Sequence, residues 1–398
     1  SLFGTKNKFA PFWSAGIGWN VHNEKFMQNQ NIVNNLRIRG SYGETGSQQF
    51  SSYQALSTFQ SYTGKRYIIW NGAELMGLGN EKLKWQVTRQ LNGGVEVGLF
   101  DGRLSASFDI YSKKTSNLLS QMDLPLANGF SSYVDNVGEV KNTGYEAMIS
   151  GYLMRDTHRN IIWSMTAKLA YTKNEITKLS EAIKRQNEFY KSKNVEINQL
   201  LYEGYAQNSI WAVPSMGIDP STGYEIFLDK NGNITDKWNP SDKRYFGVDE
   251  PKYRGNISTY FAWKDLSVNL SFAYQWGGQQ YNETLLNKVE VTNGEIDKNN
   301  VDRRVLKKRW QYIGDVKPYK GYGSVETKAT SRFVMDDNVF QFQSASVEYR
   351  LHSDFLRDKW KVETISIGAN MSDIFYISSI KRERGTSYPF ARRLALTL

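Results

Sequence analysis

Apolar and polar residues alternate along the segment 266–276. Its apolar positions are Leu266, Val268, Leu270, Phe272, Tyr274 and Trp276, and the residues between them are polar or small. Because successive side chains of a β-strand point to opposite faces, this period of two predicts a strand with one apolar and one polar face. The pattern fits two folds: a soluble sandwich that buries its apolar face, and a membrane barrel that turns this face towards lipid.

The same alternation recurs in other segments of similar length and predicts eleven strands in all. They cover approximately residues 13–21, 36–43, 91–99, 104–110, 145–151, 163–171, 253–261, 266–276, 345–351, 365–371 and 394–398. Phe340 and Phe342 are out of phase with Ala345, so we expect a β-bulge in the strand that contains them.

The connections between these strands alternate between short and long. The short ones are 100–103, 155–160, 263–265 and 353–361, and the long ones are about 43–88, 114–140, 174–250 and 277–337. Short periplasmic turns and long external loops are typical of an outer-membrane barrel, whereas a sandwich has short hairpins at both ends. The sequence therefore favours an all-β, antiparallel transmembrane barrel.

Two segments of the long loops carry structure of their own. Residues 225–238 are predicted to form a hairpin around Asn231-Gly232, a pair that tolerates positive φ at both positions. Residues 175–193 have helical spacing and predict a short external helix.

Composition agrees with a barrel. The mean hydropathy is −0.56, and no run approaches the roughly 18–20 apolar residues of a spanning helix, whereas a spanning strand needs only about 9–11 residues. Aromatic residues make up 14% of the chain, which suits both ligand stacking and the aromatic girdles of membrane barrels. The absence of cysteine excludes disulfides and thiolate metal sites.

Several segments resemble consecutive blocks of one transporter family. They are "LRIRGSYGETGS" (36–47), "LKWQVTRQLNGGVEVGLFDGRLSASFDIYSKKTSNLL" (83–119), "VGEVKNTGYEAMISG" (137–151), "GIDPSTGYEIFLDKNGN" (217–233), "PKYRGNISTYFAWKDLSVNLSFAYQWGG" (251–278) and "RFVMDDNVFQFQSASVEYRL" (332–351). In this order they resemble SusC/RagA-type TonB-dependent outer-membrane transporters. The resemblance implies that residues 1–398 are the C-terminal part of a 22-stranded barrel in the bacterial outer membrane.

The resemblance also implies partners. The plug domain, the TonB box and the remaining strands are not in this chain, so we expect the rest of the transporter to supply them. The opening segment "SLFGTKNKFAPFW" has no signal-peptide pattern, and Leu398 replaces the terminal aromatic usual in such barrels. A SusD-like surface lipoprotein would cap the external face, and the TonB complex would pull on the plug. Family substrates are mainly glycans or oligopeptides.

Two other functions remain open from the sequence. One is a passive porin or structural barrel scaffold, which would have neither plug nor TonB box. The other is a secreted carbohydrate-binding β-sandwich, which would be soluble without detergent.

Candidate site residues follow from the barrel prediction. Polar residues in mid-strand are expected to face the lumen: Arg37, Arg39, Glu96, Asp109, Glu146, Lys168, Asn269, Gln275, Glu348 and Arg393. Aromatic residues of the long loops are expected to bind ligand: Trp211, Tyr224, Tyr281, Trp310, Tyr312, Tyr319 and Tyr322. Tyr274 and Trp276 are assigned instead to the outer aromatic girdle.

Other chemistry finds little support. His22, His158 and His352 lie near periplasmic turns without a common serine or carboxylate partner, so no catalytic site, cofactor or metal site is predicted. The segment 229–236, "DKNGNITD", looks like a calcium loop, but its glycine is at position 4 rather than 6, which favours a turn. Whether calcium binds near Asp229 stays open.

The net charge of +10 permits anionic partners. The densest basic segment, 302–310, lacks an aromatic-studded recognition element, so no nucleic acid is expected. Outer-membrane lipid, lipopolysaccharide or the partner lipoprotein is the expected counter-charge. Arg392 is expected to meet lipid phosphates at the external interface.

Overall fold

The computed structural model describes residues 11–47, 56–80, 82–124, 129–130, 132–196, 200–291, 300–323, 326–381 and 393–398. Arg392 lies outside the described residues. No helix within these ranges is long and apolar enough to cross a membrane.

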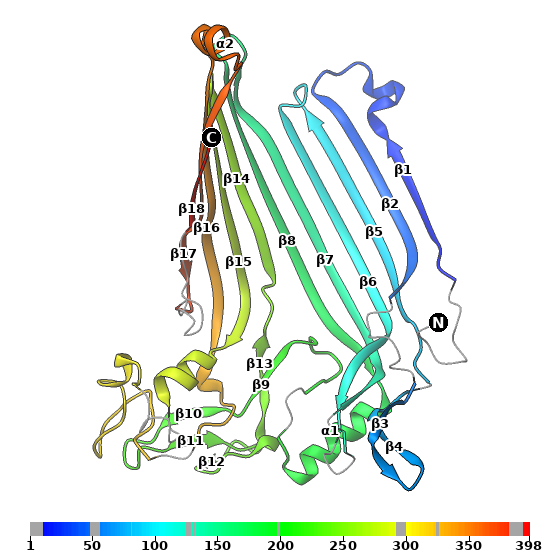
Figure 1. Ribbon diagram of the computed structural model, residues 1–398, viewed down its shortest axis with the longest axis vertical. Coiled ribbons are helices and arrows are strands. Elements are labelled where there is room, and N and C mark those ends of the chain that lie inside the picture. Colours follow the sequence, from blue (N-terminus) through cyan, green and yellow to red (C-terminus); the bar gives the residue numbers. More distant parts are fainter. Residues whose placement is uncertain are drawn as a thin grey trace.

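One large antiparallel sheet dominates the molecule, and all eleven predicted strands are confirmed in it. Its strands are β1 (Ser14–Asn20), β2 (Val33–Ser47), β5 (Gln86–Leu99), β6 (Leu104–Asp123), β7 (Ser132–Asp156), β8 (Ile161–Leu179), β14 (Tyr253–Trp263), β15 (Leu266–Tyr281), β16 (Val334–Leu351), β17 (Ile365–Ser378) and β18 (Arg393–Thr397). Neighbours in the sheet follow one another in this order, so β1 and β18 form its two edges. Figure 1 shows the sheet as a curved wall.

The two ends of the wall differ, as the connection lengths predict. Short turns join the strands at the upper end of Figure 1, and the long loops gather at the lower end. Positive φ at Phe100, Asp101 and Gly102 closes the β5–β6 turn. The connection 353–361 is a short helix rather than a plain turn: α2 (Asp354–Trp360) begins at the N-cap Ser353 and ends at Lys361 in the left-handed conformation.

The loop end carries further elements. They are β3 (Thr58–Tyr67), β4 (Trp70–Gly77), α1 (Glu181–Lys193), β9 (Ser209–Ala212), β10 (Ser215–Ile218), β11 (Glu225–Leu228), β12 (Ile234–Thr235), β13 (Arg244–Val248) and a π-helical segment, Leu285–Glu290. β3 pairs with β4, β9 with β13, and β10, β11 and β12 form a small sheet.

Local details of the loop end differ from the prediction. The helix begins at Glu181, because the Ser180 side chain caps it and residues 175–179 continue β8. The hairpin of β11 and β12 has a five-residue turn, in which Gly232 has a φ of 87° and Asn231 is not among the residues with positive φ. Strands β6 and β7 extend to Asp123 and from Ser132, so most of the predicted connection 114–140 is β-structure.

The pairing registers separate the sheet into an apolar and a polar face. One cross-strand row of the apolar face comprises Trp19, Ile38, Val95, Phe108, Ala147, Leu169, Gly255, Tyr274, Phe340 and Ile377. The register shifts between Ser344 and Phe342 on β16, where Gln343 is the extra residue. This bulge confirms the phase change predicted from Phe340, Phe342 and Ala345.

Aromatic rings form a continuous belt near the loop end of the apolar face. Tyr145, Tyr171, Tyr253 and Trp276 lie side by side on four neighbouring strands, with ring centroids 5.0, 5.0 and 5.6 Å apart. Tyr274 stacks on Trp276 at 5.0 Å. The arrangement is that of the aromatic girdle predicted for Tyr274 and Trp276.

Buried apolar side chains gather at the loop end rather than within the wall. The main cluster comprises Val137, Val140, Ile176, Leu179, Ile183 and Leu201. It joins β7 and β8 to α1 and to the loop that follows the helix. This packing gives the external loops a core of their own, which the sheet by itself does not have.

Candidate functional site

The ten predicted lumen residues lie on one face of the sheet. Arg37, Glu96 and Lys168 occur in one cross-strand row, and Asp109, Glu146 and Gln275 occur in the next together with Arg39. Asn269, Glu348 and Arg393 belong to further rows of the same face. The face is therefore polar along the length of the wall.

An ionic contact crosses three strands on this face. Arg39 Nη2 of β2 donates to both carboxylate oxygens of Asp109 on β6, at 2.7 and 2.8 Å, and its Nε lies 3.4 Å from Glu96 on β5. Gly94 lies between Arg39 and Asp109 in the register, and a Cβ there would overlap the Asp109 carboxylate. The glycine lets the two side chains meet across the intervening strand.

A cavity of about 570 Å³ lies where the polar face meets the external loops. It is lined by Ile210, Asp249, Gln280, Tyr281, Asn282, Glu283, Thr284, Asp337, Tyr376, Ser378, Ile380 and Lys381. Tyr376 stands in the same cross-strand row as Lys168, and Ser378 in the row of Gln275. Gln275 Nε2 also donates to Asp337 Oδ2 at 3.0 Å, so the cavity continues the polar face.

Carboxylates dominate the charge of this cavity. Burial raises the pKa of Asp249, and the negative charges of Asp337 and Glu250 raise it further. The carboxylates of Asp249, Glu283 and Asp337 make the cavity favourable for cationic groups and for hydroxyl or amide donors. We call it the lumen pocket.

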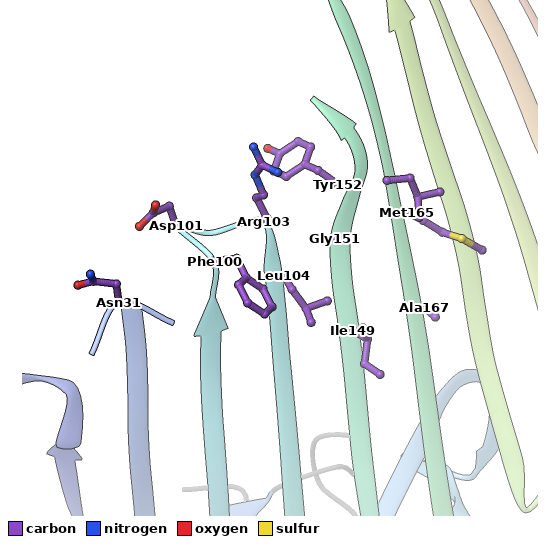
Figure 2. A pocket seen from close by; sticks show the side chains of 11 residues that line it. Asn31, Phe100, Asp101, Arg103, Leu104, Ile149, Gly151, Tyr152, Met165 and Ala167 are labelled. Carbon is purple, nitrogen blue, oxygen red and sulfur yellow. The ribbon is translucent and has the colours of Figure 1, made fainter. Parts of the chain in front are cut away.

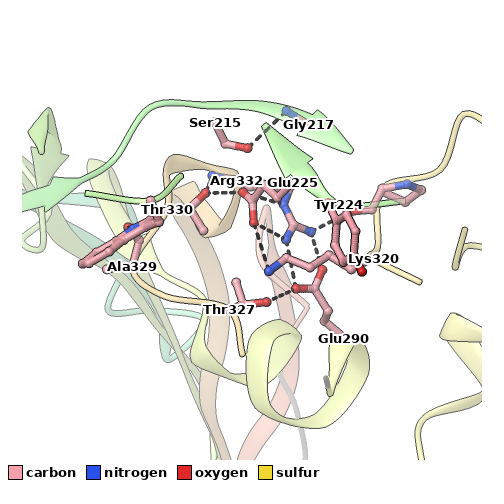
Figure 3. A network of polar contacts seen from close by, with 12 residues as sticks. Ser215, Gly217, Tyr224, Glu225, Glu290, Lys320, Thr327, Ala329, Thr330 and Arg332 are labelled. Carbon is pink, nitrogen blue, oxygen red and sulfur yellow. Dashed lines mark hydrogen bonds and ion pairs between the residues drawn. The ribbon is translucent and has the colours of Figure 1, made fainter. Parts of the chain in front are cut away.

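A buried ionic network holds two long external loops together (Figure 3). Arg332, just before β16, donates through Nε and Nη2 to both oxygens of Glu225 on β11, at 3.1 and 3.0 Å, and also pairs with Glu290. The Thr330 hydroxyl donates to Glu225 at 2.7 Å. The side chains of Glu225 and Glu290 are 1% and 0% exposed. The network ties the loop between β8 and β14 to the loop between β15 and β16.

The electrostatics of this network favour the ionised state. Burial opposes ionisation of Glu225, but hydrogen bonds and charge from Arg332 outweigh it and lower the pKa of Glu225. Burial likewise opposes the charge of Arg332, whereas the hydrogen bonds that Arg332 donates to Glu290 and Glu225 raise its pKa. Lys320 lies 3.8 Å from Glu225 and adds a further cation.

Two arginine side chains of the basic segment 302–310 bind to residues of their own loop. Arg304 pairs with Asp302 at 2.7 Å and lowers the pKa of that carboxyl to about 2. Arg309 is 1% exposed, donates to the carbonyl oxygens of Glu290 and Lys320, and lies 4.5 Å above the Tyr322 ring. These contacts make the segment part of the loop architecture as well as a basic surface.

The predicted ligand aromatics do not form one cluster. Tyr281 lines the lumen pocket. Trp211 packs against Tyr202, Tyr205 and Tyr245, with ring centroids 4.7–6.0 Å apart. These four rings form a cluster on β9, on β13 and on the loop that precedes β9.

The remaining predicted aromatics are spread over the loops. Trp310 donates to the Pro220 carbonyl at 2.9 Å and covers Gly223. Tyr319 is partly buried, and burial raises its pKa. Tyr224, Tyr312 and Tyr322 are 51%, 74% and 58% exposed. Their role in ligand binding stays a prediction.

The segment 229–236 is organised as a turn around Asp229. One oxygen of its carboxylate accepts hydrogen bonds from the backbone N–H groups of Asn231 and Asn233, both at 2.8 Å, and the other accepts from the Asn233 side chain. These bonds lower the pKa of Asp229. Among the described residues, no cluster of three or more His, Asp or Glu side chains could hold a metal ion.

A family model for "TonB dependent receptor-like, beta-barrel" matches residues 2–294. The chain belongs to this family. TonB-dependent receptor P3 of Formosa agariphila is 29% identical over 413 residues, which cover 98% of this chain and 39% of the relative. TonB-dependent receptor SusC of Bacteroides thetaiotaomicron is 24% identical over 316 residues, covering 75% of this chain and 31% of the relative.

A solved structure shares the fold. The RagAB peptide transporter matches with a TM-score of 0.81 and 23% identity, over 96% of this chain and 41% of the matched chain. The chain thus spans roughly two fifths of the length of the RagAB chain and of receptor P3. The predicted SusC/RagA-type barrel and its outer-membrane location are confirmed. The family comprises transporters rather than enzymes, and the single curved sheet excludes a sandwich.

Sequence reasoning missed the lumen pocket and the ionic network. The pocket unites Asp249, Asp337 and Tyr376, which come from three distant segments. The sequence assigned Asp337 to the end of the long loop 277–337, whereas it is the fourth residue of β16. No local pattern marks Glu290 or Arg332 as partners, because 42 residues separate them.

Proposed function

We propose that this chain forms the barrel wall and external loops of an energised importer for glycans or oligopeptides. The observation that carries the proposal is the continuity between the lumen pocket at the external mouth and the polar face of the wall. A ligand that enters at the mouth would pass from carboxylates and Tyr281 to the charged residues of the lumen. The rest of the transporter would supply the plug, the N-terminal strands and the contact with the TonB complex.

A SusD-like lipoprotein lid belongs to the same proposal. The tip of the β3–β4 hairpin extends from the loop end (Figure 1). Its residues Ile68, Ile69 and Trp70 are 80%, 78% and 72% exposed. Ile68 has a φ of 59°, an unfavourable conformation for a β-branched residue. Exposed apolar side chains on a strained turn suit a protein contact, and a lid above the mouth would cover them.

The function is tested by deleting the gene for the whole transporter in its host. Growth is then measured on a panel of glycans and of oligopeptides as sole nutrients. We expect slower growth on one class, the same defect in a strain without TonB, and recovery on complementation. A porin would give uptake that does not depend on TonB, which would reject the importer.

Replacing Tyr281 with Ala is expected to weaken ligand binding about tenfold, because Tyr281 lines the lumen pocket. The measurement is calorimetric titration of the purified whole transporter with the imported ligand. Ile313→Ala, which changes a loop residue that is 83% exposed, is the matched control. Equal affinities of both variants would remove the lumen pocket from the binding site.

Replacing Trp70 with Ser is expected to lower recovery of the lipoprotein lid with the affinity-purified transporter several-fold, because the side chain loses most of its apolar contact area. Gln60→Ser on the same hairpin serves as the control. Unchanged recovery of the lid with the Trp70 variant would place the lid contact elsewhere.

A further inference from the structure

A second cavity lies outside the lumen pocket, at the end of the wall where short turns join the strands, which is the periplasmic end of the barrel (Figure 2). It measures about 740 Å³ and is open to solvent in the isolated chain. It lies between the β5–β6 turn and strands β7 and β8. Its floor is formed by Leu104, Ile149, Gly151, Met165 and Ala167. We call it the rim groove.

The floor of the rim groove belongs to the lipid-facing side of the sheet. Leu104, Gly151 and Met165 form one cross-strand row, and Ile149 pairs with Ala167 in the next row. Both rows share the face of Phe108 and Leu169, which carries the aromatic girdle at its other end. Gly151 and Ala167 have little or no side chain, so the larger apolar residues beside them enclose a depression. The groove therefore opens where hydrocarbon chains surround the barrel.

The rim of the groove carries two opposite charges. Asp101 and Arg103 both belong to the β5–β6 turn and line the groove. Tyr152 lies across from Arg103, and its backbone N–H donates to the Arg103 carbonyl oxygen at 2.9 Å. Asp101 Oδ1 accepts a hydrogen bond from Asn34 at 2.8 Å. Within the described ranges, the Arg103 guanidinium has no hydrogen bond or ion pair with a side chain. The Arg155 guanidinium lies over the Tyr152 ring, 5.3 Å from its centroid.

We propose that the rim groove binds a zwitterionic aminophospholipid of the periplasmic leaflet. Arg103 would hold the phosphate, Asp101 the headgroup ammonium, and the apolar floor one acyl chain. The phosphate of an anionic lipid would also pair with Arg103, but such a lipid has no ammonium group to pair with the Asp101 carboxylate. The two opposite charges of the groove therefore favour the zwitterion. Arginine and tyrosine at the boundary of the hydrocarbon layer are suited to this position, because each has a polar end and an apolar stem or ring.

A protein segment is a poorer occupant than a lipid. The floor lies on the membrane-facing side, where a bound segment with free backbone groups would lack hydrogen-bond partners. An acyl chain has no such groups. The proposal depends on the outer-membrane location of the barrel and does not depend on the imported ligand.

The test uses the whole transporter, extracted in a mild detergent and analysed by native mass spectrometry with lipid identification. It is then reconstituted in nanodiscs that contain phosphatidylethanolamine, phosphatidylglycerol or phosphatidylcholine. We expect one retained phosphatidylethanolamine per barrel. Arg103→Gln should weaken its retention about tenfold, the order expected for one lost hydrogen bond to a charged group. Asp101→Asn should remove the preference for phosphatidylethanolamine over phosphatidylglycerol.

A third variant tests the acyl-chain site. Ala167→Leu would fill the floor and should abolish retention without changing barrel assembly. Ala147→Leu adds the same volume on the same face but outside the groove, and should retain the lipid as the unmodified protein does. If the Arg103→Gln and Ala167→Leu variants retained the lipid as well as the unmodified protein does, the proposal would be overturned. A preference for phosphatidylglycerol that survives Asp101→Asn would overturn the assignment of a zwitterion.

Discussion

Replacing Arg332 with Gln is expected to release the two long external loops from each other. The substitution leaves Glu225 and Glu290 buried without their main cation, and removing one partner of a buried ion pair costs roughly 3–5 kcal/mol. Hydrogen exchange and limited proteolysis of the whole transporter should show opening of residues 209–248 and 282–333. The strands of the barrel should keep their protection, because the network lies outside them.

Two controls separate the ionic network from a general loss of charge. Arg350→Gln breaks the ion pair between Arg350 and Glu348, whose side chains are 58% and 42% exposed. Because this pair is exposed, its loss should change the hydrogen-exchange protection of the loops little. The triple variant Glu225→Gln, Glu290→Gln, Arg332→Met removes both buried carboxylates and should recover part of the protection. Loops that stay closed in the Arg332 variant would show that apolar packing alone holds them.

Acid should weaken the same contact. The folded-state pKa of Glu225 is lowered, so the stabilisation that its ion pair contributes is present above the unfolded pKa. It is lost as the pH falls through the folded pKa. The loops should therefore open in acid below the ordinary pKa of a glutamate, and the Arg332 variant should lack this dependence.

Alternation along the sequence predicts the wall because a strand exposes each face to one environment. The apolar residues of segment 266–276 share one face of the sheet and the intervening residues share the other, so the alternation can be seen in neighbouring positions of the sequence. The bulge at Gln343 was readable for the same reason, since an extra residue shifts the phase of the apolar positions.

The loop architecture was not readable in this way. Glu225 and Arg332 are 107 residues apart, and no periodicity links them. The extent of β6 and β7 was also missed, because apolar and polar residues do not alternate in the segments 114–123 and 132–140. The polar residues of the wall were predictable, whereas the lumen pocket depends on how distant loops meet.

Replacing Gly255 with Ala is expected to impair barrel assembly. A Cβ at this position would overlap both the Lys168 carbonyl oxygen and the Tyr274 phenol group. Tyr274 lies over Gly255 and donates to the Lys168 carbonyl at 2.7 Å, so the ring uses the space that the glycine leaves. Because a backbone atom obstructs the new methyl group, the strands must separate, and overpacking of this kind typically costs about 1–3 kcal/mol.

The measurement is the fraction of folded whole transporter in outer-membrane preparations, followed by its heat-modifiable migration on gels. Gly93→Ala and Gly40→Ala are matched controls, since a Cβ at either would have its nearest contact at an ordinary 3.6 or 3.9 Å. The double variant Gly255→Ala, Tyr274→Ala removes the ring but not the Lys168 carbonyl, and should restore assembly only in part. Full recovery in the double variant would place the whole strain on the ring. Normal assembly of the Gly255→Ala variant would show that β8, β14 and β15 can move apart enough to hold the methyl group. Glycine would then not be required at position 255.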